Sequence, residues 1–212
     1  MRSRPVYRTV LAVDVEQSTR RPNPVKELLR LETYRIVEAA MRVAGIHACY
    51  CDPVVDRGDG VLILVRPVDE VPKTLLLHPL LPVLTHLLID YNATLPTAHR
   101  NGCRLRLRAV IHSGEVHRDG NGPFGETLDV ACRLLDSPRL KSCLKCTPAP
   151  IVLVVSDDIY RSIIRHGYEG ISPSTFTQAV SVHTAGQRTR GWIHVPTVIA
   201  ADRQLDYLAA AR

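Results

Sequence analysis

The chain has 212 residues, with 27 Lys and Arg against 21 Asp and Glu, and 45% of it is hydrophobic and 23% charged. These are the proportions of an ordinary globular protein, so they exclude disorder, collagen and coiled coil as descriptions of the whole chain. The length is that of one domain of about 100–200 residues. We therefore expect residues 1–212 to form a single domain with its core over residues 7–195.

The apolar runs and the charge bear on location and partners. No run reaches the roughly 18 apolar residues that a membrane helix needs, and the richest, TLLLHPLLPVLTHLLI, contains two His and two Pro. This segment predicts a buried, kinked helix. The first residues, MRSRPVYR, show no secretory signal, so we expect a cytoplasmic protein with no membrane partner. The net charge of +6 comes from scattered basic residues, which favours solubility over nucleic-acid binding.

Six cysteines raise the question of metal or redox chemistry. Cys143 and Cys146 have the spacing of a metal knuckle or a redox pair, but Cys49 and Cys51 are separated by one residue, which does not match it. Without a secretory signal we expect reduced thiols. The pattern favours a loop over residues 138–148 that carries two thiols, with a metal or redox pair as the alternative.

In the first half of the chain, β-rich runs alternate with two segments of helical periodicity. The sequence Asp-Arg-Gly-Asp-Gly between two apolar runs predicts a hairpin turn. Pro near the start of the first helix and Gly after its end fit helix termini. The expected elements are a strand Tyr7–Val13, a helix Asn23–Ala44, a hairpin Ala48–Val55 with Val61–Val65, a helix Pro72–Asn92 and a strand Arg104–His112.

The second half adds a glycine-rich loop and further alternating elements. Ser156, followed by two Asp, is expected to cap a helix. The expected elements are the loop Gly120–Gly125, a helix Gly125–Asp136, a strand Ile151–Val155, a helix ending near His166, strands Ala179–Val182 and Gly191–Val195, and a terminal helix within residues 199–212 (Ala200–Ala211). The order predicts an α+β fold with a ferredoxin-like βαββαβ core and a C-terminal extension.

Two carboxylates stand at strand ends in this scheme. Asp14 closes the first strand, and Asp59 lies in the hairpin tip beside Gly58. In a ferredoxin-like sheet these ends meet, and two close carboxylates repel unless a cation lies between them. Mg²⁺ or Mn²⁺ bridging phosphates is the usual occupant. Residues 15–19, which include Ser18 and Thr19, then offer backbone N–H groups to phosphate oxygens. The alternative is that Asp14 only ends a strand and Asp59 only makes a turn.

Three motifs in order resemble the class III nucleotidyl cyclase catalytic domain, the adenylate and guanylate cyclase family. TVLAVDVEQST resembles its first strand, RGDGVLILV its hairpin, and LRAVIHSGEV with FGETLDVACRLLD its later strand and helix. The resemblance implies two Mg²⁺ or Mn²⁺ ions on Asp14, Asp59 and the Val15 backbone, and Arg133 on the triphosphate. It also implies a homodimer with nucleoside triphosphate as substrate. VSDDIYRSIIRHG and RGWIHV look like a small actinobacterial cyclase-like group.

The chain departs from the family pattern at four positions. Asp129 stands where the family has a ribose-orienting Asn, and with Arg133 it also has the i, i+4 spacing of a plain ion pair. His183 stands nearest the usual triphosphate lysine. At the base-reading positions the chain has Val55 and Gly122, neither of which offers a polar side chain.

These departures leave two functional readings open. One is a cyclase that forms a 3′,5′-cyclic nucleotide and pyrophosphate, with poor base selectivity or a pyrimidine preference, as in the antiphage pyrimidine cyclases of this superfamily. The other is a catalytically degenerate, dimeric sensor or scaffold. Two further patterns are weaker. HSGEVHRD could supply metal ligands, but a strand end that runs into a loop is the preferred interpretation. Arg104, Arg106 and Arg108 could form a nucleic-acid face, but a solvated or dimer-facing strand is preferred.

Overall fold

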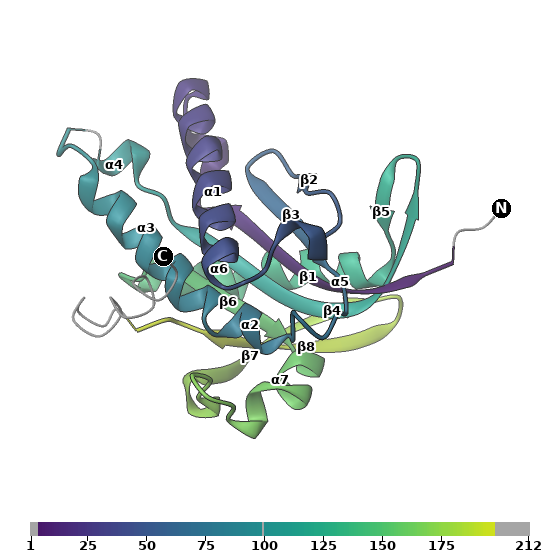
Figure 1. Ribbon diagram of the computed structural model, residues 1–212. Helices are drawn as coiled ribbons and strands as arrows, with labels where there is room; N and C mark the ends of the chain where they lie inside the picture. The colour runs from purple at the N-terminus through teal and green to yellow at the C-terminus, as the bar shows by residue number, and fades with distance from the viewer. Residues whose placement is uncertain (1–3, 99, 198–212) are drawn as a thin grey trace.

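A computed structural model describes residues 4–98 and 100–197, and its centre is one mixed sheet (Figure 1). The strand order is β2-β3-β1-β4-β6-β8-β7, and β5 pairs with β4 outside this path. The strands are β1 (Val6–Val15), β2 (Val55–Asp56), β3 (Gly60–Val65), β4 (Leu107–Asp119), β5 (Gly122–Phe124), β6 (Ile151–Ser156), β7 (Phe176–Thr184) and β8 (Gln187–His194).

The first four strands confirm the predicted ferredoxin-like core. β1 is antiparallel to both β3 and β4, and β2 is antiparallel to β3, so the hairpin lies beside the first strand. The C-terminal extension continues this sheet: β6 is parallel to β4, and β8 and β7 follow it antiparallel. The fold is therefore α+β with an extended sheet, as the order of elements predicted.

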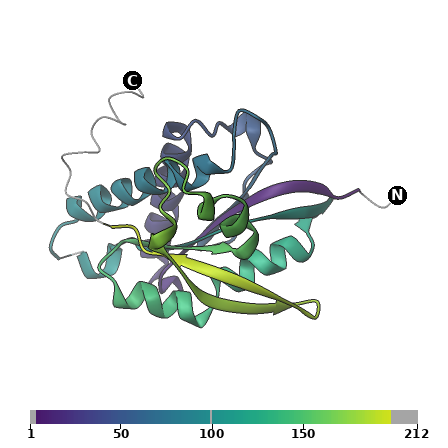
Figure 2. The ribbon, with the colours of Figure 1, turned by 90° about the horizontal axis from the view of Figure 1, so that it is seen from below.

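Helices cover both faces of the sheet, with α1 and α3 on one side and α5 and α6 on the other (Figures 1 and 2). The α-helices are α1 (Asn23–Val43), α2 (Thr74–Leu77), α3 (Leu80–Thr94), α4 (Arg100–Cys103), α5 (Glu126–Leu135), α6 (Pro138–Cys146) and α7 (Asp157–Ser162). Short 3₁₀ turns are η1 (Ser18–Arg20), η2 (Ala48–Tyr50), η3 (Ile164–His166) and η4 (Pro173–Thr175).

The alternation of apolar residues along β1 divides the core in two. Leu11, Val13 and Val15 pack with α1 and α3, whereas Val10 and Ala12 pack with α5 and α6. Successive side chains of a strand point to opposite faces, so Asp14 lies on the α5 face. Each fully buried Val or Leu contributes about 1.5–3 kcal/mol to folding. The two apolar layers therefore stabilise the sheet from both faces.

The prediction of the hairpin's first strand, Ala48–Val55, is largely wrong. Residues 48–50 form η2, Cys51 makes an isolated bridge to Val65, and regular pairing resumes only at β2. Pro53 lies between these two pairings and has no N–H to donate to a ladder. The pairing shifts by one residue across it, because Cys51 pairs with Val65 but Val55 pairs with Leu62.

Three further expectations need correction. The predicted helix Pro72–Asn92 is two helices, α2 and α3, separated at His78–Pro79. Residues 138–146 form α6 rather than a loop, because Ser137 caps the helix by accepting from the Leu140 N–H at 3.3 Å. Ser156 precedes α7 but its hydroxyl makes no capping bond there.

The strand expected over Arg104–His112 begins later and ends later, since β4 runs to Asp119 and pairs with β5 in a hairpin. HSGEVHRD is therefore strand, and part of the expected loop Gly120–Gly125 is β5. The expected terminal helix, Ala200–Ala211, lies outside the described residues.

By length and composition, one stretch of the described residues, Thr74–Thr94, is apolar enough to cross a membrane. In the structure it comprises α2 and α3, and residues such as Leu76, Leu80, Leu84 and Leu88 are at most 2% exposed within the core against α1. Burial of this kind is what a core helix requires.

Candidate active site

Asp14 lies at the end of β1 with a buried arginine beside it. β1 pairs Asp14 with Gly60 of β3 and with Arg108 of β4. Arg108 donates from Nη2 to Oδ2 of Asp14, and the two side chains are only 10% and 17% exposed. Burial lowers the pKa of Arg108 from its usual value, but no protein environment of this kind deprotonates an arginine. The Arg108 guanidinium therefore orients the carboxylate of Asp14 through a charge-assisted hydrogen bond.

Asp59 comes to the same end of the sheet through the hairpin tip. Its carbonyl oxygen accepts from the Val15 N–H at 3.1 Å, so its backbone is adjacent to the residue after Asp14. Ser18, in the turn after β1, donates its hydroxyl to Oδ2 of Asp59. Since the Val15 N–H is used in this way, it is not available to a phosphate.

Gly60 makes the close approach of these two strand ends possible. A Cβ at Gly60 would lie 2.3 Å from the carbonyl oxygen of Val13. That is far inside van der Waals contact, so a larger residue would push β3 away from β1. The Gly of the turn sequence is thus required by strand spacing, in addition to any role in the turn.

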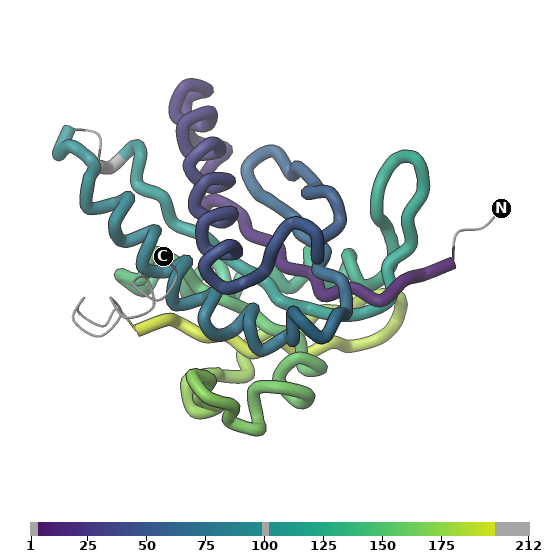
Figure 3. The backbone as a smooth tube through the Cα atoms, viewed as in Figure 1, coloured from purple at the N-terminus to yellow at the C-terminus, as the bar shows by residue number. Residues whose placement is uncertain are grey.

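Arg30 of α1 fixes the hairpin tip from outside (Figure 3 shows the β2–β3 loop returning beside α1). Its guanidinium donates to the Gly58 carbonyl at 2.7 Å and forms an ion pair with Asp56. The Arg30 hydrogen bonds hold the pKa of Asp56 well below its usual range. Gly58 adopts φ +76° and donates its N–H to Asp56 at 2.8 Å, which closes the turn ahead of Asp59.

A pocket of about 410 Å³ opens where these elements meet. Five residues predicted to touch metal or substrate line it, namely Val15, Ser18, Thr19, Gly58 and Asp59. Three basic residues of the α1 side, Arg21, Lys26 and Arg30, also line it. A cavity with carboxylate and cationic groups on its walls suits a metal-bound polyphosphate. Asp14 is not among the lining residues; it faces the α5 side of the sheet.

The donor set suits a hard divalent cation. Among residues 4–98 and 100–197 there is no group of three or more His, Cys, Asp or Glu that could hold a metal by themselves. Mg²⁺ does not need such a cage, because it is commonly bound by one or two carboxylates together with substrate phosphates and water. Asp59, which lines the pocket, fits that pattern. Asp14 lies on the neighbouring strand end, but its carboxylate is paired with Arg108 on the other face of the sheet.

The structure places the other predicted residues away from this pocket. Asp129 and Arg133 are both exposed on α5, on the opposite face of the sheet from α1, and no ion pair joins them in the described part of the chain. His183 is exposed on β7, where it pairs with Arg188 of β8, at the far edge of the sheet. Arg57 of the hairpin tip donates to the Cys132 sulfur of α5 at 2.8 Å. Neither Arg133 nor Asp129 makes an ion pair or hydrogen bond with Asp59 among the described residues.

The two base-reading positions are also separated. Val55 is half-buried and packs against the α5-side core, so its side chain is partly used in packing. Gly122, with φ +132°, begins β5 in the projecting β4–β5 hairpin.

The three arginines predicted to share a solvated face do not do so. Arg108 of β4 is buried against Asp14, and Arg106, just before β4, donates to the carbonyls of Thr147 at 2.7 Å and Leu144, at the end of α6. Arg104 is exposed. Their alternation in the sequence does not indicate that α6 covers this face.

The sequence did not predict the basic residues of the pocket. Lys26 and Arg30 of α1, and Arg21 just before it, line the pocket through tertiary contacts.

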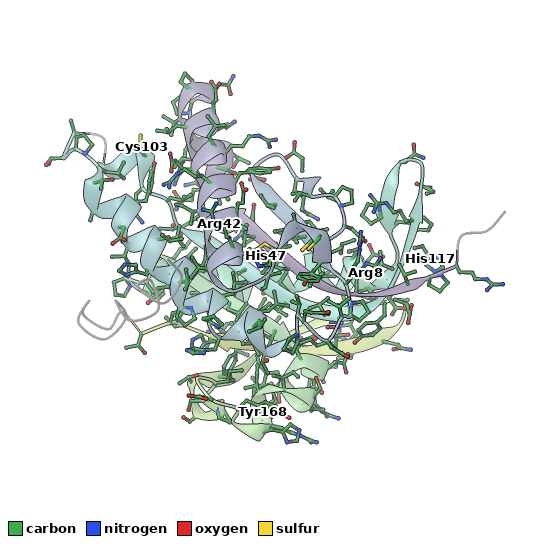
Figure 4. The ribbon with its side chains drawn as sticks, in the orientation of Figure 1. Arg8, Arg42, His47, Cys103, His117 and Tyr168 are labelled. Atoms are coloured by element: carbon green, nitrogen blue, oxygen red, sulfur yellow. The ribbon has the colours of Figure 1, made fainter. Side chains whose placement is uncertain are left out.

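The six cysteines form no disulfide, and none of them lines the pocket. Cys143 is half-buried and Cys146 exposed on α6, and all six cysteines are free. Figure 4 shows Cys103 beside α4, at the opposite end of the molecule from His117 on the β4–β5 hairpin. With no metal-binding group among the described residues, the spacing of Cys143 and Cys146 gains no support as a metal knuckle.

Comparison with solved structures identifies the fold. The chain superposes on an adenylate/guanylate cyclase/hydrolase from Silicibacter pomeroyi with a TM-score of 0.61 at 19% identity, covering 92% of this chain and 99% of that one. For the guanylyl cyclase Cya2 the TM-score is 0.59 at 14% identity, over 96% and 98%. For the adenylyl cyclase CyaB from P. aeruginosa it is 0.57 at 16%, over 93% and 97%.

The structure therefore has the fold of the class III adenylate and guanylate cyclase catalytic domains over nearly its full length. The predicted resemblance is confirmed at the level of fold. No family model and no curated protein matches the sequence.

Proposed function

We propose that the chain, as one module over residues 1–212, is a cytoplasmic nucleotidyl cyclase that converts a nucleoside triphosphate to a 3′,5′-cyclic nucleotide and pyrophosphate. The observation that carries the proposal is the placement of Asp59, Ser18 and Thr19 around a basic pocket at the end of β1, in a cyclase fold. In this reaction the ribose 3′-oxygen attacks the α-phosphorus and the bond to the β-phosphate breaks. No protein nucleophile is required.

Asp14 and Asp59 are the residues that would hold the two Mg²⁺ or Mn²⁺ ions, with the Val15 backbone beside them. When bound, such ions lower the pKa of the attacking hydroxyl and neutralise the triphosphate. Arg108 holds Asp14 in one orientation through a hydrogen bond, and the Ser18 hydroxyl fixes one oxygen of Asp59 in the same way. Pre-oriented ligands of this kind reduce the reorganisation that binding requires.

Arg133 and Asp129 act on the substrate of a second chain. Both are exposed on the face opposite the pocket, so neither reaches Asp59 of its own chain. In a two-fold symmetric dimer the α5 face of one chain meets the strand ends of the other. Arg133 then stabilises charge on the phosphate oxygens, and Asp129 accepts a hydrogen bond from a ribose hydroxyl.

The base site favours a pyrimidine or little selectivity. Val55 and Gly122 offer no hydrogen bond to a purine edge, and discrimination between bases depends on polar groups left unpaired by the wrong one. Asp56, the nearest polar side chain to Val55, is already held by Arg30 and by the Tyr34 hydroxyl at 3.2 Å. It is therefore not available to replace the missing base reader.

A catalytically degenerate dimeric sensor or scaffold is the second candidate. Asp129 cannot donate a hydrogen bond as the family's asparagine does, and His183 is a weaker phosphate ligand than lysine. These substitutions favour the second candidate, whereas Asp14, Asp59 and Arg133 favour an active enzyme.

Incubation with ATP, GTP, CTP and UTP at equal concentration and Mn²⁺, followed by mass spectrometry, tests the proposal. We expect a 3′,5′-cyclic monophosphate, with CTP or UTP among the substrates consumed. Asp59→Asn should abolish the product, and the exposed Asp69→Asn should not. No cyclic product from any nucleotide would favour the degenerate module, and exclusive cyclic AMP formation would refute the argument from Val55.

A further inference from the structure

The pocket beside Asp59 contains a guanidinium nitrogen without a partner. Arg21 lies between η1 and α1 and lines the pocket. Its Nη2 donates to the carbonyl of Arg104 at 3.1 Å, which fixes the plane of the side chain. Its Nη1 is buried and has no hydrogen-bond partner within the described part of the chain. Buried donors of this kind are rare in folded proteins unless a ligand or water meets them.

Lys26 adds a second cation to the same pocket. Arg21 has the carboxylate of Glu16 nearby as a charge partner. Lys26 is exposed in the first turns of α1 and makes no ion pair among the described residues. The first turn of α1 contains no acidic residue, so the positive end of the helix dipole is not neutralised there. Arg30 differs, because Asp56 and the Gly58 carbonyl already occupy its guanidinium. Glu27 also lines the pocket and is its one carboxylate besides Asp59.

We infer that Arg21 and Lys26 bind the terminal phosphates of the nucleoside triphosphate in the pocket that Asp59 lines. The inference rests on the proposed function for the identity of the ligand. In the family pattern a lysine near the last hairpin binds the triphosphate, and this chain has His183 there. The inference assigns that role to cations at the start of α1 instead. Arg21 has a planar guanidinium whose buried Nη1 has no hydrogen-bond partner among the described residues, and Lys26 is an exposed, mobile point charge. The metal carboxylate and the phosphate-binding cations then come from one chain.

Inorganic tripolyphosphate is the probe that separates this role from catalysis, because it has the phosphate chain and no base or ribose. Its binding is measured by isothermal titration calorimetry with equal Mg²⁺ in cell and syringe. We expect Lys26→Ala to weaken binding about tenfold, the equivalent of one ion pair of about 1.4 kcal/mol. Lys145→Ala, which removes an exposed lysine on α6, is the matched control and should bind as wild type.

Arg21→Lys keeps the charge but removes the fork, and should also weaken binding. Thermal unfolding shows whether the Arg21→Lys variant is folded. If that variant is not folded, Lys26→Ala, at an exposed position, tests the inference by itself. Failure of the wild-type protein to bind tripolyphosphate, or wild-type affinity in Lys26→Ala, would overturn the inference. So would a larger loss in His183→Ala than in Lys26→Ala. The proposed function fails separately, if tripolyphosphate binds in the expected pattern but no cyclic nucleotide forms.

Discussion

Gly60 shows how one residue sets the geometry of the site. β1 and β3 pair so closely at Asp14 that any Cβ at position 60 would meet the Val13 carbonyl at 2.3 Å. We expect Gly60→Ala to lower the free energy of unfolding by about 1–3 kcal/mol, the usual cost of overpacking. Urea denaturation measures this. Gly120→Ala, where nothing lies within 4 Å of the new Cβ, is the control and should change stability by less than about 0.5 kcal/mol. Equal effects of both substitutions would mean that strand spacing is not the constraint.

Asp14 and Asp59 differ in what their removal does to the fold. Asp14 pairs with the buried Arg108, and truncation of Asp14 would remove its hydrogen-bonded partner and leave Asp136 as the carboxylate that still acts on it, which is destabilising. Asp59 is a half-buried turn residue with one side-chain partner, Ser18. Asp59→Asn should therefore remove the proposed metal ligand with little effect on folding, which makes it the better probe of function.

At the scale of elements, Asp52 connects three segments of the chain through ion pairs. It is 7% exposed and accepts from Arg8 of β1 at 2.8 Å and from Arg66, after β3, at 3.0 Å. Arg118 of the β4–β5 hairpin lies 3.8 Å away, and Figure 4 shows Arg8 near the base of that hairpin. Burial alone would raise the pKa of Asp52, but the hydrogen bonds from Arg8 and Arg66 outweigh it and lower the pKa below 3.8.

The lowered pKa of Asp52 gives a pH-dependent stability. The contribution of the ion pairs is present above the unfolded pKa of 3.8 and is lost as the pH falls through the lower folded value. We expect Asp52→Asn to be less stable than wild type by about 2 kcal/mol at neutral pH. Denaturation over a pH series should show this difference shrinking below pH 3.8. A difference that stays constant at all pH values would show that the charge of Asp52 is not involved.

The elements that the sequence predicted well are those whose signal is local. Their signals come from neighbouring residues. The structure contains the Asp-Gly turn, α1 with a proline in its first turn, and the apolar strands β1, β3 and β6. The strand expected over Ala48–Val55 failed because Pro53 interrupts its ladder, although its apolar residues fit a strand. The prolines at both ends of residues 138–148 predict a loop. In the structure Pro138 instead begins α6, because proline is tolerated in the first turn of a helix.

The site was predictable only where a motif marked it. Asp14 and Asp59 stand in recognisable segments at strand ends. Arg108, Arg30 and Arg21 contact the site through side chains from β4, from α1 and from the turn before it. Such contacts join residues far apart in sequence, and their spacing alone carries no periodic signal.

At the scale of the whole molecule, the sheet separates the two halves of the proposed site. The pocket with Asp59 lies between α1 and the hairpin tip, and Arg133 lies on α5, which covers the other face (Figure 2). We therefore propose that a complete site forms between two chains, so that a symmetric dimer would contain two such sites.

Complementation between two inactive variants tests this account most directly. Asp59→Asn supplies an intact Arg133, and Arg133→Ala supplies an intact Asp59. A mixed dimer has one whole site, so equal mixing should restore about one quarter of the wild-type rate of cyclic nucleotide formation. Each variant alone should remain inactive. Full activity of a strictly monomeric protein, or no recovery in a mixed dimer shown to have formed, would contradict a composite cyclase site.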